Sequence, residues 1–178
     1  MKKLLNAIAL AILLCAPLSV WAQMEIGKIP SEITLTGNAG GRLDGAAWIS
    51  TESKDKVTVL FYVDPDEKDL NNPASEALKK EKFPLDHYQS YGIINMAATW
   101  LPNFAISSSL RKKQKKYPNT TYVRDYNKAL VKQWGLTDDT SCVLAFDKNG
   151  KLIFRKDGLL DDQDIRNLIS AVRTHLGQ

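Results

Sequence analysis

One stretch constrains the fold more than any other: the apolar run Lys56–Val63, which is followed directly by Asp64 and Pro65. After Lys56 it consists entirely of β-branched, aromatic and leucine residues, which is typical of a strand buried on both faces in the centre of a sheet. Pro65 lacks a backbone donor for the sheet ladder, so the strand is expected to end there. Ligands of open α/β sheets bind just beyond the carboxyl ends of central strands, so the segment 64–69 is the first candidate for a functional site.

The first 22 residues predict export. Lys2 and Lys3 precede the apolar run 4–14, and a small residue, Ala22, stands at the expected cut. This order is typical of a secretory signal, and the apolar part is too short and too interrupted by Pro17 to span a bilayer stably. We therefore expect a signal peptide over 1–22, a periplasmic mature protein and no stable membrane insertion after cleavage. An uncleaved amphipathic or anchoring helix is the alternative.

Cleavage after residue 22 of 178 leaves 156 residues, which suits one domain over 23–178 with a substantial core. Loss of the two amino-terminal lysines lowers the formal net charge from +4 to +2, which argues against nucleic acid as a partner. Lipoprotein processing at Cys15 is disfavoured because Leu14, and not a small residue, precedes it. Cys142 is then the single mature cysteine, and no internal disulfide is expected.

Hydrophobic periodicity and capping residues predict strands that alternate with helices, followed by a hairpin and a last helix. Arg42 and Leu43 are expected to pair back on the first strand across a glycine-rich turn, and Asp147–Gly150 to form the hairpin turn. The order is that of an α/β, thioredoxin-like fold with a central mixed sheet flanked by helices. The expected strands are 32–35, 56–63, 88–96, 120–124, 141–146 and 151–156; the expected helices are 72–83, 103–116, 127–134 and one capped by Asp161.

Several segments also resemble known proteins. Residues 122–136 resemble the segment before the cis-proline in TlpA-type reductases and peroxiredoxins, and residues 143–152 resemble the hairpin after it. The mature chain as a whole resembles the YtfJ family of secreted bacterial proteins, which implies a thioredoxin-like fold but no established activity. That resemblance is carried by the order of short motifs at 27–30, 85–89, 107–110, 115–118, 145–150 and 156–158.

The chain departs from redox thioredoxins where their chemistry takes place. A disulfide exchange site needs a low-pKa thiolate and a resolving thiol at a helix amino terminus. Residues 64–69 hold that position here, with three aspartates and no cysteine, and Ser141 falls near the position of the cis-proline. We therefore expect no disulfide oxidoreductase activity, and the sequence indicates no catalytic residue and no cofactor.

The acidic residues at the strand ends form the main candidate site. Asp64, Asp66 and Asp69 follow the central strand, and Asp138 and Asp139 are expected to lie across from them. Carboxylates in one crevice suit a hard cation or a basic ligand. The EF-hand pattern is not met, because Asp69 stands where a glycine is required, and helix capping and turn formation explain the same residues more simply. No metal is therefore assigned.

Cys142 opens the apolar run 142–146 and is predicted to be a buried, unreactive thiol. The acidic neighbours Asp138 and Asp139 are expected to raise its pKa. Its place next to Ser141 favours the alternative, in which the thiol faces the crevice and forms mixed disulfides with a partner.

Two histidines and two aromatic residues complete the candidates. His87 and His175 lack a second histidine or cysteine nearby, so a zinc or copper site is not expected. Trp100 and Phe104 predict a protein-binding edge if they are exposed, although they more often close a core. The basic run 111–116 suits an anionic surface or an acidic partner, although a solvated helix face is the simpler interpretation.

These observations favour a binding or interaction module without redox chemistry over an enzyme. Its partner is expected to be an unknown periplasmic protein or a small ligand. The alternative is a hydrolase or metal-dependent enzyme that uses Asp64, Asp66, Asp139 and His87. A regulator of transcription is disfavoured by the export signal and by the lack of a DNA-reading motif.

Overall fold

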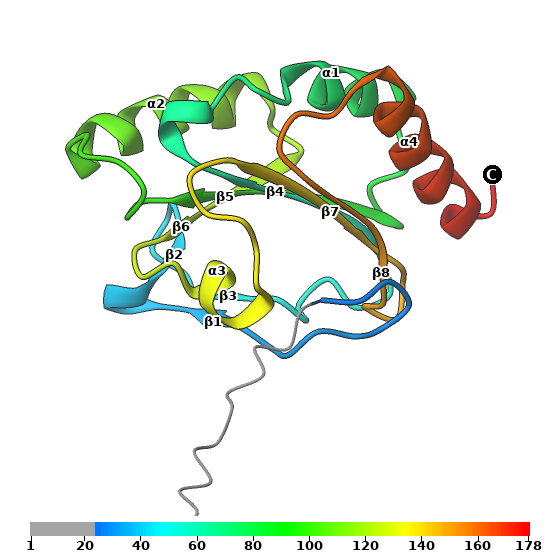
Figure 1. Cartoon of the computed structure of the whole chain (residues 1–178), viewed down its shortest axis with the longest axis horizontal. Helices are drawn as coiled ribbons and strands as arrows, with labels where there is room; N and C mark the ends of the chain where they lie inside the picture. The colour runs from blue at the N-terminus through cyan, green and yellow to red at the C-terminus, as the bar shows by residue number, and fades with distance from the viewer. Residues whose placement is uncertain (1–23) are drawn as a thin grey trace, which may run out of the picture.

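The computed structural model describes residues 24–178 (Figure 1). The predicted signal peptide over 1–22 and the predicted mature start at Gln23 lie outside the described residues. None of the helices within 24–178 combines the length and the apolar character needed to cross a bilayer.

A six-stranded mixed sheet forms the centre of the fold, in the order β2-β6-β5-β4-β7-β8. Strands β4, β5 and β6 are parallel to one another, whereas β2, β7 and β8 each run antiparallel to their neighbours. The predicted apolar run forms β4, which is flanked on both sides and buried along nearly its whole length. The strands are β2 (Gly40–Arg42), β4 (Val57–Val63), β5 (Tyr88–Asn95), β6 (Thr120–Asp125), β7 (Ser141–Phe146) and β8 (Leu152–Asp157).

Helices cover one face of this sheet, and a short helix with a small second sheet covers the other (Figure 1). The connections β4–β5 and β5–β6 step in the same direction, so right-handed crossovers place α1 (Asn72–Glu81) and α2 (Asn103–Lys116) on the same face. Helix α4 (Asp162–Leu176) joins them there. The opposite face carries α3 (Ala129–Trp134) and the two-stranded sheet of β1 (Thr34–Leu35) and β3 (Trp48–Ile49).

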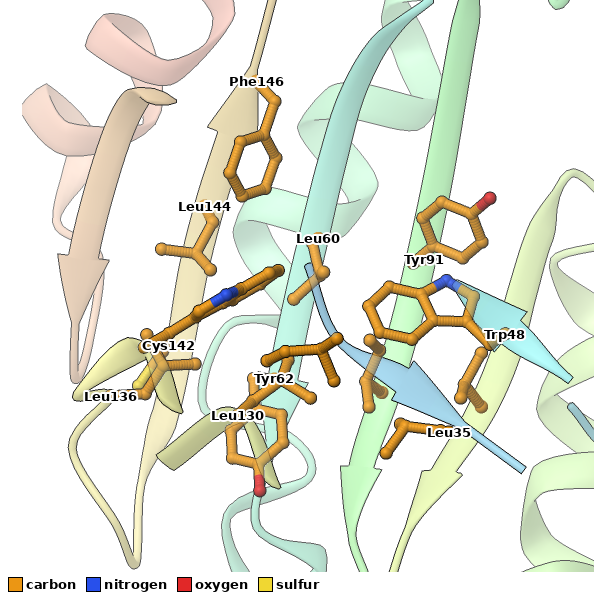
Figure 2. Packing of buried hydrophobic residues seen from close by; sticks show 14 of the residues in the cluster. Leu35, Trp48, Leu60, Tyr62, Tyr91, Leu130, Leu136, Cys142, Leu144 and Phe146 are labelled. Atoms are coloured by element: carbon orange, nitrogen blue, oxygen red, sulfur yellow. The ribbon is translucent and has the colours of Figure 1, made fainter. Parts of the chain in front are cut away.

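Alternate residues of the central strands fill two separate cores. Leu60 and Tyr62 of β4 face α3 and the small sheet together with Cys142 and Leu144 of β7 (Figure 2). The neighbouring residues of the same two strands pack against α1 and α4 on the other face. This two-sided burial explains why β4 and β7 appear in the sequence as nearly continuous apolar runs.

The predicted pairing of Arg42 and Leu43 with the first strand is wrong. Strand β1 pairs with β3, and β2 instead forms the edge of the large sheet beside β6. Gly40 permits this approach, because a Cβ atom there would overlap the carbonyl oxygen of Arg124. The pairing joins residues some eighty positions apart, which a glycine-rich turn in the sequence does not indicate.

Capping signals locate the later helices well. Asp161 caps α4, as predicted: it accepts a hydrogen bond from the backbone N–H of Asp164, and the Asp164 side chain completes a capping box that was not predicted. Gly135 closes α3 in the left-handed conformation, which is common at the carboxyl ends of helices. Helix α1 begins at Asn72, the first residue of the expected helix, and Asn71 holds the cap position before it.

Candidate functional site

The carboxyl ends of β4, β5 and β6 and the start of β7 converge at one edge of the sheet, which we call the carboxyl edge (Figure 1). Asp64 is the first residue past β4. Its backbone N–H donates to the carbonyl of Thr140 over 3.0 Å, so the loop that precedes β7 closes directly over the end of β4. The end of β4 and the loop before β7, which were expected to lie across from each other, therefore meet at this edge.

Asp64 itself is a buried carboxylate. Its Oδ1 accepts a hydrogen bond from the N–H of Asp66 over 2.8 Å and caps the short 3-10 turn Pro65–Glu67. Burial raises the pKa of Asp64, and the charges of Asp66 and Asp139 raise it further, although the hydrogen bond from Asp66 opposes them. Asp64 therefore acts as a cap, as the simpler interpretation expected, although burial and the nearby carboxylates disfavour its negative charge.

The predicted acidic crevice is only partly assembled. Asp66 and Asp139 lie close enough for their charges to act on Asp64, but both are exposed. Asp69 is directed towards α1, where it accepts a hydrogen bond from Asn72 Nδ2 over 3.0 Å. Within residues 24–178, no group of three or more histidine, cysteine or acidic side chains is arranged to hold a metal ion.

A lysine that the sequence analysis did not single out lies among these carboxylates. Lys128 Nζ forms an ion pair with Asp138 Oδ2 at 2.6 Å and lies 3.9 Å from Asp139 Oδ1. Asp138 also accepts a hydrogen bond from Asn95 Nδ2 over 2.8 Å, and these partners keep its pKa below the usual value in spite of burial. The crevice therefore contains its own counter-ion.

Backbone strain accompanies this ion pair. Lys128 and Asp139 both adopt the left-handed conformation, each with a φ of 54°. Residues other than glycine enter this region rarely, and they do so mainly where the surrounding structure holds them. The sequence carries no glycine or asparagine at either position to indicate these turns, so the arrangement was not predictable from local signals.

Asn71 connects three elements beneath the carboxyl edge. Its Nδ2 donates to Ser141 Oγ over 3.1 Å and to the carbonyl of Gly158 over 3.0 Å. Its Oδ1 accepts from the N–H of Leu160 over 2.9 Å. Ser141, at the predicted cis-proline position, thus takes part in a buried polar contact on the helical face of the sheet.

Cys142 points in the opposite direction from Ser141, into the core on the α3 side (Figure 2). Its side chain is buried, as predicted, and Sγ donates a weak hydrogen bond to the carbonyl of Thr137 over 3.4 Å. Burial raises the pKa of this thiol to about 12, and the charge of Asp157 adds to the effect. The alternation of side chains along β7 therefore removes the thiol from the crevice.

A second buried pair lies next to this thiol. Tyr62 donates its hydroxyl to Asp125 Oδ2 over 3.1 Å, and the same carboxylate accepts the N–H groups of Asn127 and Leu130. Burial, together with the charge of Asp125, raises the pKa of Tyr62. Asp125 thereby joins β4, β6 and the start of α3, which is a structural role.

His87 lies at the other end of the sheet from the acidic residues. Its carbonyl accepts a hydrogen bond from Val57 at the start of β4, whereas Asp64 follows the end of that strand. A strand of seven residues places these points about 20 Å apart, so His87 and Asp64 are not in one site. His175, near the end of α4, contacts the carbonyl of Ala171 four residues earlier.

Trp100 and Phe104 are exposed at the carboxyl edge. Trp100 lies in the loop that follows β5 and Phe104 in the first turn of α2, and the two residues are 87% and 77% exposed. Leu159, in the loop that follows β8, is 58% exposed at the same edge, beside the residues that Asn71 holds. Of the two interpretations given to Trp100 and Phe104, core closure is excluded by these exposures.

The fold and this edge define a thioredoxin-like protein with no cysteine at the site of the redox thiol pair. The thioredoxin domain of a thiol-disulfide oxidoreductase from Bacteroides vulgatus superposes with a TM-score of 0.61 at 14% identity, over 83% of this chain and 97% of that one. The predicted α/β thioredoxin-like fold is therefore confirmed.

The chain belongs to the family described as "Bacterial protein of unknown function (YtfJ_HI0045)", which it matches over residues 30–175. It is 28% identical to the uncharacterized protein YtfJ of Escherichia coli over 93% of this chain and 95% of that one. An uncharacterized protein of Haemophilus influenzae is 30% identical over 70% of each chain. The resemblance to the YtfJ family drawn from the sequence motifs is confirmed.

Proposed function

We propose that this protein is an exported, redox-inactive thioredoxin-like module that binds a protein partner at the carboxyl edge of its sheet. The observation that carries the proposal is the exposure of Trp100, on the loop that follows β5, and of Phe104, in the first turn of α2. Large aromatic side chains are among the residues most enriched at the centres of protein interfaces. Two large apolar side chains exposed so close together in sequence are typical of a surface that binds another protein.

The lack of redox chemistry is supported by the positions of the sulfur and carboxylate groups. The segment where a thiol pair would stand is Asp64–Asp69, and the carboxylates there cannot exchange a disulfide. The thiol of Cys142 is buried on the far side of β7, and its raised pKa leaves almost none of it as thiolate at neutral pH.

A periplasmic location is part of the same proposal. It is supported by the basic and then apolar pattern of residues 1–22, which is typical of a secretory signal. Amino-terminal sequencing of protein recovered from the periplasm should begin near Gln23. Retention of Met1 on cytoplasmic protein would contradict the export part of the proposal without affecting the binding part.

Site-specific photo-crosslinking tests the binding edge. A benzoylphenylalanine placed at Phe104 or Trp100 in the native bacterium should yield a discrete crosslinked product of defined mass. The same amino acid at Lys80, an exposed position on α1 away from the carboxyl edge, serves as the matched control. The Phe104 product should disappear on Trp100→Ser. Equal products from Phe104 and Lys80, or no product from either edge position, would contradict the proposal.

An insulin reduction assay tests the proposed lack of redox activity. With a reductant present, the protein should leave the rate at the uncatalysed background, because no accessible thiol pair exists within residues 24–178. A rate well above background that survives Cys142→Ser would contradict the absence of redox chemistry at this site.

A further inference from the structure

The helical face of the sheet contains an open groove between α1 and α2. Its volume is about 400 Å³, within the range of about 300–1,000 Å³ that is usual for small-molecule sites. The two helices belong to separate apolar clusters: α1 packs with α4, and α2 packs over β5 and β6. Val63 of β4 is partly buried and contacts both clusters, which places it under the gap between the helices.

The floor of the groove is apolar. It is formed by Phe61 and Val63 of β4, Ile94 of β5 and Tyr122 of β6. The Tyr122 ring lies over Gly92, where a Cβ atom would come within 2.8 Å of the ring carbon Cε1. Gly92 thus lets an aromatic ring lie flat on the sheet at a position where any other residue would lift it into the groove.

The rim of the groove has one sign of charge. Five lysines line it and no aspartate or glutamate does: Lys68, Lys79, Lys82, Lys113 and Lys116. Among the described residues, Lys116 is the only one of the five in an ion pair, at 3.7 Å from Glu76. This asymmetry is large for a chain whose formal net charge is only +4.

Lys113 is the lysine placed furthest towards the interior. It is half-buried on α2, and its Nζ donates to the carbonyl of Lys68 over 3.1 Å, across the mouth of the groove. Burial lowers its pKa, and the neighbouring charges of Lys68 and Lys116 act in the same direction, against the attraction of Asp69. An anion bound beside Lys113 would relieve this repulsion and replace a weak neutral acceptor with a charged one.

We propose that the groove between α1 and α2 binds a single-chain amphiphile with an anionic headgroup, of the fatty acid or lysophospholipid class. The acyl chain would lie on the floor of Phe61, Val63 and Tyr122, and the headgroup would pair with Lys113 and Lys79. A second copy of this chain would bring the same lysine rim and be repelled, and the lysines of residues 1–22 would repel that segment in the same way. The proposal concerns a different site from the partner-binding edge and does not depend on it.

Displacement of a fluorescent fatty acid tests the proposal on the purified protein. Dansylaminoundecanoic acid should gain fluorescence on binding, and palmitate or lysophosphatidylglycerol, kept below its micelle concentration, should displace it. Displacement by only one of the two shows whether the groove accepts a fatty acid or a lysophospholipid. Cetyltrimethylammonium, which has a similar chain and a positive headgroup, should displace the probe at least tenfold less well. Equal displacement by the cation, or no fluorescence gain at all, overturns the proposal.

Matched variants locate the site. The double change Lys79→Gln and Lys113→Gln should weaken probe binding by about tenfold or more, which is the loss of one charge-assisted hydrogen bond. Lys112→Gln with Lys115→Gln, on the exposed side of the same helix, should leave it unchanged. Ser109→Phe should block the groove, whereas its neighbour Ser108→Phe, which does not line the groove, should not.

Melting curves accompany each variant, so a fold defect is separated from a binding defect. If Ser109→Phe unfolds the protein, the lysine pair alone decides the question. Unchanged binding by the Lys79 and Lys113 double variant, or an equal loss in the Lys112 and Lys115 control, overturns the assignment of the headgroup to this rim.

Discussion

The side chain of Asn71, just before α1, donates a hydrogen bond to the hydroxyl of Ser141, at the start of β7, over 3.1 Å. The two residues are seventy positions apart, and both side chains are buried. The contact joins Asn71, which follows the segment 64–69 that lacks a thiol pair, to Ser141 at the predicted cis-proline position. Neutral hydrogen bonds therefore connect these two segments of the chain.

Replacing Asn71 with alanine should therefore destabilise the whole fold. The change removes three hydrogen bonds and leaves the buried N–H of Leu160 and the partly buried carbonyl of Gly158 without partners. We expect a loss of about 2–3 kcal/mol in the free energy of unfolding, measured by urea denaturation. Asn72→Ala, at the neighbouring exposed position, should change it by less than about 0.5 kcal/mol. Equal effects of the two changes would refute the structural role of Asn71.

Thiol labelling should be slow in the folded protein. Cys142 is fully buried and its pKa is raised to about 12, so both access and thiolate fraction are low at neutral pH. A maleimide or disulfide reagent should react far faster after denaturation than before it. Ser108→Cys in a Cys142→Ala background gives the exposed control on α2. Native labelling of Cys142 as fast as this control would restore the alternative of a crevice-facing thiol.

Asp64→Asn should stabilise the protein at neutral pH. Because the folded-state pKa of Asp64 is raised, the folded state binds the proton more tightly than the unfolded state, and stability falls as the pH rises through that range. Asparagine keeps the acceptor for the Asp66 N–H and removes the charge. The gain in melting temperature, roughly 2–4 °C for each 1 kcal/mol, should shrink on acidification below the pKa of Asp64.

The exposed carboxylate supplies the control for this prediction. Asp66→Asn should leave the melting temperature within the small range typical of surface changes at both pH values. A lower melting temperature of Asp64→Asn at neutral pH would contradict this prediction. It would mean that the attraction between Asp64 and Lys128 stabilises the folded state more than burial of the Asp64 charge destabilises it, and it would support an ionic site in the crevice.

Calcium should stabilise the wild-type protein very little. Lys128 already neutralises Asp138 and lies close to Asp139, so a divalent cation would have to displace it. We expect less than about 1 kcal/mol of stabilisation at millimolar calcium, measured by thermal melting. A rise of several degrees that disappears in the Asp64→Asn and Asp66→Asn double variant would instead support a cation site.

The sequence by itself determined the features that arise from neighbouring residues. The run of β-branched and aromatic residues from Val57 to Val63 specified a doubly buried central strand, and Pro65 ended it. Asp161 specified the start of α4, since an N-cap residue interacts only with the first turn of its own helix. The missing thiol pair after β4 was equally visible, because redox chemistry requires particular side chains at particular positions.

Tertiary structure alone decided which distant segments and side chains are neighbours. The pairing of β2 with β6, the separation of His87 from Asp64 and the entry of Lys128 among the carboxylates all depend on contacts between distant segments. The lysine-lined groove arises in the same way, because each helix pattern shows an apolar face but not the gap left between two helices. Local propensities fix the elements, and the free energy of packing the whole sheet fixes their neighbours.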